Sequence, residues 1–249
     1  MDPSERVTAD LFDAVLFDLD GVLTDTARIH SRAWKQTFDE FLRRRGPPGD
    51  PDLRPFDGDE DYRLHVDGKP RADGVRDFLR SRGITLPEGG PDDPAGAVTV
   101  AGVGILKDGL VQRAIESEGV EVYTGTLAWL EQLRGDGIRM AVVSSSSNCR
   151  VVLAAARIAA RFEARVDGVT LEEQGLAGKP APDSFLKAAH QLRVEPKRAV
   201  VVEDAISGVQ AGRDGGFGLV IGVARKGDAD ALAANGANLV VSDLAELVR

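Results

Sequence analysis

The sequence contains a single cysteine, Cys149, among its 249 residues, so an intramolecular disulfide is excluded. A reducing compartment is compatible with this, and we expect the protein in the cytoplasm. A basic surplus is also missing, because 31 lysines and arginines stand against 40 aspartates and glutamates and leave a net charge of −9. That balance disfavours nucleic acids and acidic membranes as partners, since both are bound by basic surfaces.

Long apolar runs are absent as well. No segment approaches the roughly 20 apolar residues of a membrane span, and residues 1–14 carry several acids in place of the apolar stretch of a signal peptide. The 43% of hydrophobic residues still suffices for a sizeable core, and the length suits one large domain or two modest ones. We expect a monomer without a membrane or nucleic-acid partner.

Residues 15–26 read VLFDLDGVLTDT, an apolar strand that brings Asp18 and Asp20 to its carboxyl end. Side chains two residues apart on a strand share a face, so both carboxylates can line one cleft at the ligand-binding edge of an α/β sheet. Close carboxylates resist ionising together unless a cation or hydrogen bonds separate their tasks. The pair therefore indicates phosphoryl transfer beside a metal ion. A polar turn is the alternative, whereas a calcium loop fails on register.

Three later segments also present polar side chains after apolar runs or in rigid loops. Ser144 follows one strand, where its hydroxyl can hold a phosphate oxygen or cap the helix predicted over 149–157. Lys179 lies between prolines and a glycine, either as a solvated charge or as a fixed ammonium that neutralises carboxylate and phosphoryl oxygens. Glu203 and Asp204 end a β-branched run and offer the oxygen ligands that Mg²⁺ prefers, or form a solvated acidic turn.

Hydrophobic periodicity predicts the organisation of the chain. Beyond residue 122, helical patterns alternate with short strands predicted at 138–143, 199–202, 219–223 and 239–241. This alternation is typical of a parallel sheet covered on both faces. The region from 27 to 121 shows helical spacing at 29–42, 75–79 and 110–115, with segments rich in proline and glycine at 47–51 and 87–94. We therefore predict a core domain formed by 1–26 and 122–249, with a helical cap domain, 27–121, inserted into it.

The four motifs together resemble, in order and spacing, those of the haloacid dehalogenase (HAD) superfamily of phosphotransferases. The opening segment, with His30 and the run RAWK at 32–35, looks like that of the β-phosphoglucomutase family. The resemblance implies an α/β fold, in which helices flank the parallel sheet of a Rossmann-like HAD core and a helical cap is inserted. It also implies that Asp18 is the nucleophile, phosphorylated on its carboxylate, and that Asp20 is the general acid and base.

The resemblance implies a Mg²⁺ site as well, with ligands from Asp18, the backbone carbonyl of Asp20, Glu203 and Asp204. In the core, the expected contacts with the transferring phosphoryl group come from Ser144, Asn148 and Lys179, with Ser146 close by. In the cap, the segment 66–71 looks like the family's substrate-specificity loop. The substrate-binding residues expected there are Gly68, Lys69, Arg71, Lys107 and His30.

Within this set, Arg71 falls where a guanidinium grips the non-transferring phosphate, which suits its bidentate geometry. Lys107 would join His30 in linking cap closure to the acid and base residue. From the residues alone, His30 is equally a packed side chain on an amphipathic helix, and Thr26 is either a hinge or a helix cap.

Two positions depart from the family pattern. Lys69 follows Gly68, whereas the family commonly places its loop lysine before the glycine, and Asp108 stands where the family usually has asparagine.

The implied activity is the Mg²⁺-dependent interconversion of β-glucose 1-phosphate and glucose 6-phosphate, with β-glucose 1,6-bisphosphate as intermediate and activator. The alternative is a HAD-type phosphatase that uses water to hydrolyse a sugar phosphate or a similar metabolite. A catalytically silent sugar-phosphate sensor is a third hypothesis, and the completeness of the motif set argues against it.

Overall fold

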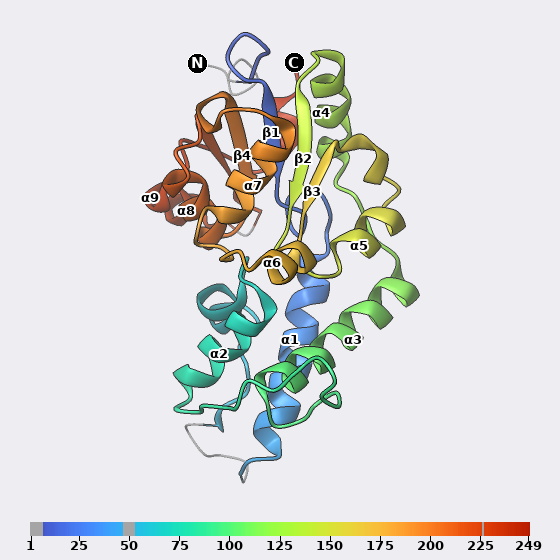
Figure 1. Ribbon diagram of the computed structural model, residues 1–249, viewed down its shortest axis with the longest axis vertical. Helices are drawn as coiled ribbons and strands as arrows, with labels where there is room; N and C mark the ends of the chain where they lie inside the picture. The colour runs from blue at the N-terminus through green and yellow to red at the C-terminus, as the bar shows by residue number, and fades with distance from the viewer. Residues whose placement is uncertain (1–6, 47–52, 226) are drawn as a thin grey trace. The chain divides into compact units, whose positions relative to one another are not determined.

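The computed structural model describes residues 7–46, 53–225 and 227–249 (Figure 1). Residues 1–6, part of the segment in which we predict no signal peptide, lie outside this description. Contacts within the chain define two compact units. The core unit comprises Met1–Thr26 and Val120–Arg249, and the inserted unit comprises Ala27–Gly119. The assignment of the inserted unit as a cap domain stays a prediction.

The core unit is built on a six-stranded parallel sheet with the strand order β3-β2-β1-β4-β5-β6. The strands are β1 (Ala14–Phe17), β2 (Arg139–Val143), β3 (Ala164–Val166), β4 (Ala199–Glu203), β5 (Leu219–Val223) and β6 (Leu239–Val241). The predicted α/β fold is confirmed. Only β3 was not foreseen.

Strand β1 lies at the centre of the sheet, between β2 and β4. Its last residue, Phe17, pairs in register with Val142 on one side and with Val202 on the other. Apolar β-branched residues fill these strands because helices bury both faces of the sheet. The polar residues that follow β1, β2 and β4 therefore emerge together at one edge.

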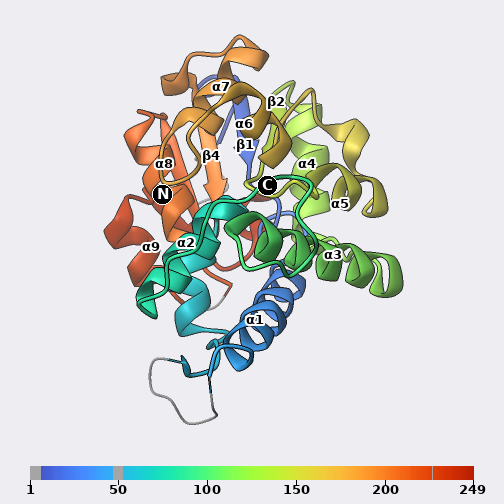
Figure 2. The ribbon, with the colours of Figure 1, turned by 60° about the horizontal axis from the view of Figure 1, so that its bottom comes forward.

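Helices cover the two faces of this sheet (Figure 2). Their bounds are α4 (Thr124–Gly135), α5 (Cys149–Ala155), α6 (Gly168–Gln174), α7 (Asp183–Leu192), α8 (Ile206–Asp214) and α9 (Ala229–Asn235), with 3₁₀ turns η4 (Ala159–Arg161), η5 (Pro196–Arg198) and η6 (Leu244–Leu247). Phe185 of α7 shares a buried cluster with Leu16. Trp129 of α4 packs edge-on against Phe17, with ring centroids 5.5 Å apart. Alternate residues of β1 thus face opposite layers.

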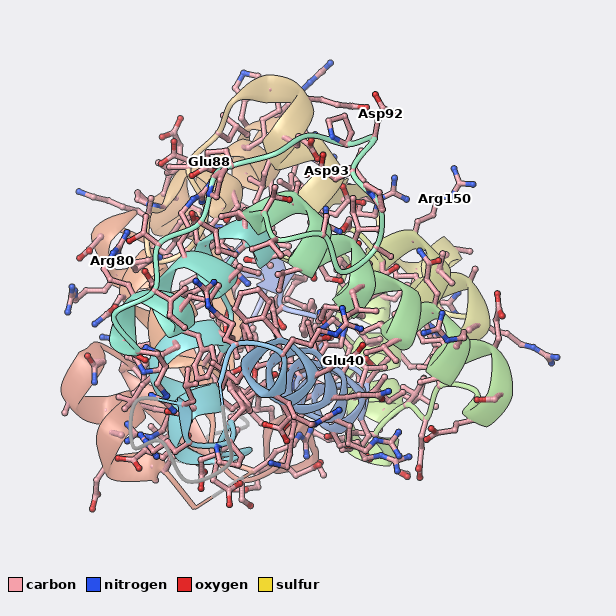
Figure 3. All side chains as sticks on the ribbon, turned by 90° about the horizontal axis from the view of Figure 1, so that it is seen from below. Glu40, Arg80, Glu88, Asp92, Asp93 and Arg150 are labelled. Carbon is pink, nitrogen blue, oxygen red and sulfur yellow. The ribbon has the colours of Figure 1, made fainter. Side chains whose placement is uncertain are left out.

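In the inserted unit, the elements are helical: α1 (Ala27–Arg43), the π-helical turn η3 (Tyr62–Val66), α2 (Arg71–Ser81) and α3 (Val100–Glu118). An aromatic cluster fills its interior, with Phe38 stacked on Trp34 at 5.0 Å and against Phe78 at 4.1 Å. The helical periodicity predicted here is confirmed. Figure 3 shows Glu88, Asp92 and Asp93 on the connection between α2 and α3.

Candidate active site

The turn that follows β1 places two acids at the carboxyl edge of the sheet. Asp18 is buried, and its carboxylate accepts a hydrogen bond from the backbone N–H of Asp20. Gly21 has a φ of +97°, and a Cβ atom there would fall 2.1 Å from Oδ2 of Asp204. Only glycine meets both constraints. The chain can therefore turn sharply after Asp20 while Asp204 approaches from the end of β4.

Lys179 is fully buried among these acids. Its Nζ lies 2.5 Å from Oδ1 of Asp18 and 2.6 Å from Oε1 of Glu203, and it donates to the carbonyl of Val143 at 3.0 Å. Burial alone would lower the pKa of Lys179, but attraction to the two carboxylates outweighs this effect and raises it. The side chain therefore holds a positive charge between two acids from different strands.

The acids at this edge also form a candidate metal site. Asp18, Glu203 and Asp204 each offer a carboxylate oxygen, and these three oxygens lie within 4.8 Å of one another. Burial, together with the charge of Asp20, raises the pKa of Asp18 to about 6, and burial raises that of Glu203 to about 7, against the pull of Lys179. Lys179 thus does not fully offset the cost of ionising Asp18 and Glu203. A divalent cation would offset the rest of this cost, and a cluster of hard oxygen ligands fits Mg²⁺.

The carboxylate of Asp20 has a polar neighbour at each oxygen. Thr26 donates its hydroxyl to Oδ1, and the hydroxyls of Thr24 and Thr26 lie 2.8 Å apart. Oγ of Ser144 lies 3.5 Å from Oδ2, at the long limit of a hydrogen bond. These contacts fix the direction in which the acid points. Whether Thr26 is also a hinge stays a prediction.

The loop after β2 carries the predicted serines and leads into α5. The backbone N–H of Ser146 donates to Oγ of Ser144 at 3.1 Å, and that of Asn148 donates to Oγ of Ser146, also at 3.1 Å. Asn148 occupies the N-cap position of α5. The hydroxyls therefore brace the loop from within. The helix ends at Ala155, two residues short of the predicted end.

Two residues predicted to bind substrate pair within the inserted unit. Nδ1 of His30, on α1, lies 2.9 Å from Nζ of Lys107, on α3, and this ammonium lies 4.9 Å from the ring centroid of Trp34. All three side chains are buried. Burial, together with the charge of Lys107, lowers the pKa of His30 well below its usual value. A neutral imidazole of His30 can therefore accept a hydrogen bond from the ammonium of Lys107 at Nδ1.

The predicted specificity loop lies at the start of α2. Gly68 has a φ of +69°, and Lys69 pairs with Asp77 through an Nζ–Oδ2 distance of 2.8 Å. Arg71, the first residue of α2, forms an ion pair with Asp108 of α3. Each basic side chain of this loop thus contacts a carboxylate of its own unit. A phosphate group would compete with these carboxylates for the two basic side chains.

The structure brings the predicted residues together in two groups. In the core unit, the group at the carboxyl edge comprises Asp18, Asp20, Thr26, Ser144, Ser146, Asn148, Lys179, Glu203 and Asp204. In the inserted unit, His30 contacts Lys107, and the loop of Gly68, Lys69 and Arg71 lies at the start of α2.

Sequence reasoning missed Tyr123, Arg225 and Asp243, which support the turn after Asp20. One signal was available. Arg225 comes two residues after the strand predicted at 219–223, and so at the carboxyl edge where ligands of such sheets bind.

Comparisons with known proteins show what the whole chain resembles. The model of the haloacid dehalogenase-like hydrolase family matches residues 12–216. The β-phosphoglucomutase of Mycobacterium bovis is 50% identical over 238 residues, which cover 94% of this chain and 91% of that protein. Hexitol phosphatase A of Escherichia coli is 30% identical over 235 residues, covering 93% and 91%. The solved β-phosphoglucomutase of Clostridium difficile has a TM-score of 0.72 at 23% identity, covering 95% and 93%.

The chain therefore belongs to the haloacid dehalogenase-like hydrolase family. It is an enzyme, either a phosphoglucomutase or a closely related phosphatase, that acts on small phosphate-bearing molecules. The likeness to solved structures supports the fold alone. Among the described residues, no helix is both long and apolar enough to cross a membrane.

Proposed function

We propose that this enzyme is a Mg²⁺-dependent β-phosphoglucomutase that interconverts β-glucose 1-phosphate and glucose 6-phosphate, with β-glucose 1,6-bisphosphate as intermediate and activator. The observation that carries the proposal is the buried Lys179, which joins Asp18 to Glu203 at the edge where Asp20 and Asp204 also lie. The 50% identity to a mycobacterial β-phosphoglucomutase supports the choice of reaction.

In the proposed first step, a carboxylate oxygen of Asp18 attacks the phosphorus of the bisphosphate. The new bond joins Asp18 to phosphorus, the ester bond to the sugar breaks, and Asp20 gives its proton to the departing sugar oxygen. In the second step, a sugar monophosphate with its phosphate at the other position gives a hydroxyl proton to Asp20. Its oxygen bonds to the phosphorus as the bond between Asp18 and phosphorus breaks. The contacts of Asp20 with Thr26 and Ser144 suit this role, because a general acid must be aimed at the oxygen that it serves.

The remaining core residues suit charge compensation, which dominates catalysis of phosphoryl transfer. Lys179 presents an ammonium beside the attacking carboxylate. Mg²⁺ would be held by Asp18, Glu203, Asp204 and the backbone carbonyl of Asp20, and when bound it supplies positive charge to the phosphoryl oxygens. Ser144, Ser146 and Asn148 offer hydroxyl and amide groups to the same oxygens.

In the inserted unit, we propose that Arg71 binds the non-transferring phosphate and that Gly68 and Lys69 form the adjoining loop. Because Arg71 already pairs with Asp108, that phosphate must either share the guanidinium with the carboxylate of Asp108 or displace the carboxylate from it. His30 and Lys107 are proposed to link closure of the cap to the acid and base residue. Closure excludes water, which would otherwise hydrolyse the aspartyl phosphate.

A phosphatase remains the second candidate, because hexitol phosphatase A is similar over most of its length. Such an enzyme would use the same core with water as the acceptor. Incubation with Mg²⁺, β-glucose 1-phosphate and a catalytic amount of the bisphosphate separates the two activities. Rapid formation of glucose 6-phosphate supports the mutase, whereas release of inorganic phosphate in proportion to the substrate consumed supports the phosphatase.

Asp18→Asn tests the nucleophile in the same assay. The variant should fold normally, because amide and carboxylate have nearly the same shape, yet it should form no phosphoenzyme. Turnover at the wild-type rate in this variant would refute the assignment of Asp18.

A further inference from the structure

A guanidinium grips the turn that carries Asp20. Arg225 lies two residues beyond β5, and its Nε donates to the carbonyl of Gly21 at 2.7 Å, while Nη2 lies 3.4 Å from the carbonyl of Val22. These are the two peptide carbonyls that directly follow Asp20. One rigid, planar group therefore sets the direction of two successive peptide units in a short irregular turn.

Arg225 is itself fixed by an acid near the C-terminus. Its Nη1 lies 2.6 Å from Oδ2 of Asp243. The other oxygen, Oδ1, accepts from the backbone N–H of Ala245 at 2.8 Å and caps η6. A Cβ atom at position 125 would fall 1.9 Å from this Oδ1, so Gly125 makes room for the carboxylate. Asp243 is thus held by backbone on one side while it holds Arg225 on the other.

An aromatic ring completes the support. Cζ of Arg225 lies 3.5 Å from the ring centroid of Tyr123, a stacking distance for a guanidinium. The hydroxyl of Tyr123 donates to Oδ1 of Asp25 at 3.1 Å, and its backbone N–H donates to the carbonyl of Leu23 at 3.3 Å. The segment that carries Tyr123 therefore contacts the far end of the same turn.

We propose that Arg225, held by Asp243 and Tyr123, is a positioning residue that aims Asp20 at the leaving oxygen. The inference rests on the proposed function, because it assigns Arg225 to the proton-transfer step. It requires no contact between Arg225 and the substrate. A displacement of the acid by about 1 Å is enough to cost about 10²-fold in rate.

The leaving group of the phosphoryl donor separates positioning from a purely structural role. A sugar oxygen needs a proton as it departs, whereas acetate, the leaving group of acetyl phosphate, needs none. Phosphoryl transfer to Asp18 should be measured in Arg225→Met with β-glucose 1,6-bisphosphate and with acetyl phosphate as donors. We expect a loss of about 10²-fold with the sugar donor and of less than about threefold with acetyl phosphate.

A matched control lies at the other end of β1. Arg198 pairs with both carboxylate oxygens of Asp13, at 2.6 and 2.8 Å, and its Nη1 donates to the carbonyl of Asp10 at 3.1 Å. It therefore makes the same kinds of contact as Arg225, but at the amino end of the strand. Arg198→Met should lower thermal stability less, because its ion pair is more exposed, and should leave the ratio of the two donor rates unchanged.

Two further variants keep the test decisive if Arg225→Met does not fold. Arg225→Lys keeps the charge but cannot reach both carbonyls and Asp243 at once, so we expect less than about tenfold recovery with the sugar donor. Asp243→Asn leaves Arg225 in place and weakens its support, and the sugar donor should again suffer the larger loss. An equal loss with both donors, or no loss, in these variants overturns the inference.

Asp20→Asn separates failure of this inference from failure of the proposed function. If Asp20→Asn does not slow the sugar donor more than acetyl phosphate, Asp20 is not the acid and both proposals fall. If Asp20→Asn shows that preference and the Arg225 and Asp243 variants do not, only the positioning role of Arg225 is wrong.

Discussion

Each of the two units buries a lysine, and the contacts of the two lysines differ. Lys179 of the core unit lies between the carboxylates of Asp18 and Glu203. Lys107 of the inserted unit contacts a neutral imidazole, that of His30, and the ring of Trp34. In the core, the charge of the lysine binds two acids together. In the inserted unit, it lowers the proton affinity of its neighbour.

Among the predicted changes, we expect the largest effect from Lys179→Met. The variant leaves two carboxylates buried without their cation, which should cost about 3–5 kcal/mol of unfolding free energy. Turnover should fall by about 10³-fold, because a positive charge next to the transferring group is lost. Urea unfolding and steady-state kinetics measure the two effects.

Two further variants sharpen that result. Lys197→Met removes an exposed lysine of the same unit and should change neither quantity. Adding Glu203→Gln to Lys179→Met removes one of the stranded charges, so it should restore part of the stability and none of the activity. If Lys179→Met is as stable and as active as the wild type, the ammonium does not hold the acids together.

The second prediction concerns how the stability of the protein depends on pH through two buried acids of the core unit, Glu203 and Asp18. Burial raises the pKa of Glu203 from its usual 4.5 to about 7, so the folded state binds more protons than the unfolded state between these values. The stability of the metal-free protein should therefore fall as pH rises through this window, by about 3 kcal/mol. The raised pKa of Asp18 acts in the same direction.

Urea unfolding in the presence of a chelator, at about pH 5 and about pH 7.5, measures this slope. Glu203→Gln should flatten it, and Mg²⁺ should stabilise the wild type more at the higher pH, where the carboxylates are deprotonated. Stability that rises with pH in the metal-free protein would contradict the prediction.

The sequence predicts only part of the candidate site in the core unit. The acids were foreseen because apolar runs marked β1 and β4, and the carboxyl ends of parallel strands meet at one edge. Lys179 was foreseen from the glycine and prolines that surround it in the sequence. Strand β3 was missed because its three residues, Ala-Arg-Val, form no apolar run. The contact of Arg225 with Gly21 joins residues 204 positions apart, and no local pattern encodes such a pair.

In the inserted unit, the sequence predicted the helices better than the ion pairs. Apolar spacing located α1, because Trp34 and Phe38 recur at helical period and face the aromatic cluster. It did not reveal that Arg71 pairs with Asp108, because that contact depends on how α2 packs against α3. Side-chain partners across elements follow from tertiary packing, which periodicity does not specify.

The third prediction tests the other lysine. Lys107→Met removes the positive charge beside His30, so the pKa of His30 should rise toward its usual value of 6.5, although burial will keep it lower. The lost hydrogen bond and ring contact should cost about 1 kcal/mol of stability. An NMR titration of the His30 imidazole measures the shift. The control is Lys35→Met. Lys35 lies on α1 with His30 and is half exposed, so its removal should leave the pKa of His30 unchanged.

The smallest effect should come from Asp108→Asn. This variant tests whether the carboxylate of Asp108 competes with a phosphate group for Arg71. The ion pair with Arg71 is partly exposed, so it is worth less than about 1 kcal/mol. Its removal should lower KM for β-glucose 1-phosphate by about threefold with kcat unchanged, because the guanidinium no longer has to leave a carboxylate. Asp73→Asn, which breaks the surface pair with Arg76, should leave KM unchanged. A higher KM in Asp108→Asn would mean instead that the carboxylate holds Arg71 in its binding orientation. Asp108 would then support its basic partner, as Asp18 and Glu203 support Lys179.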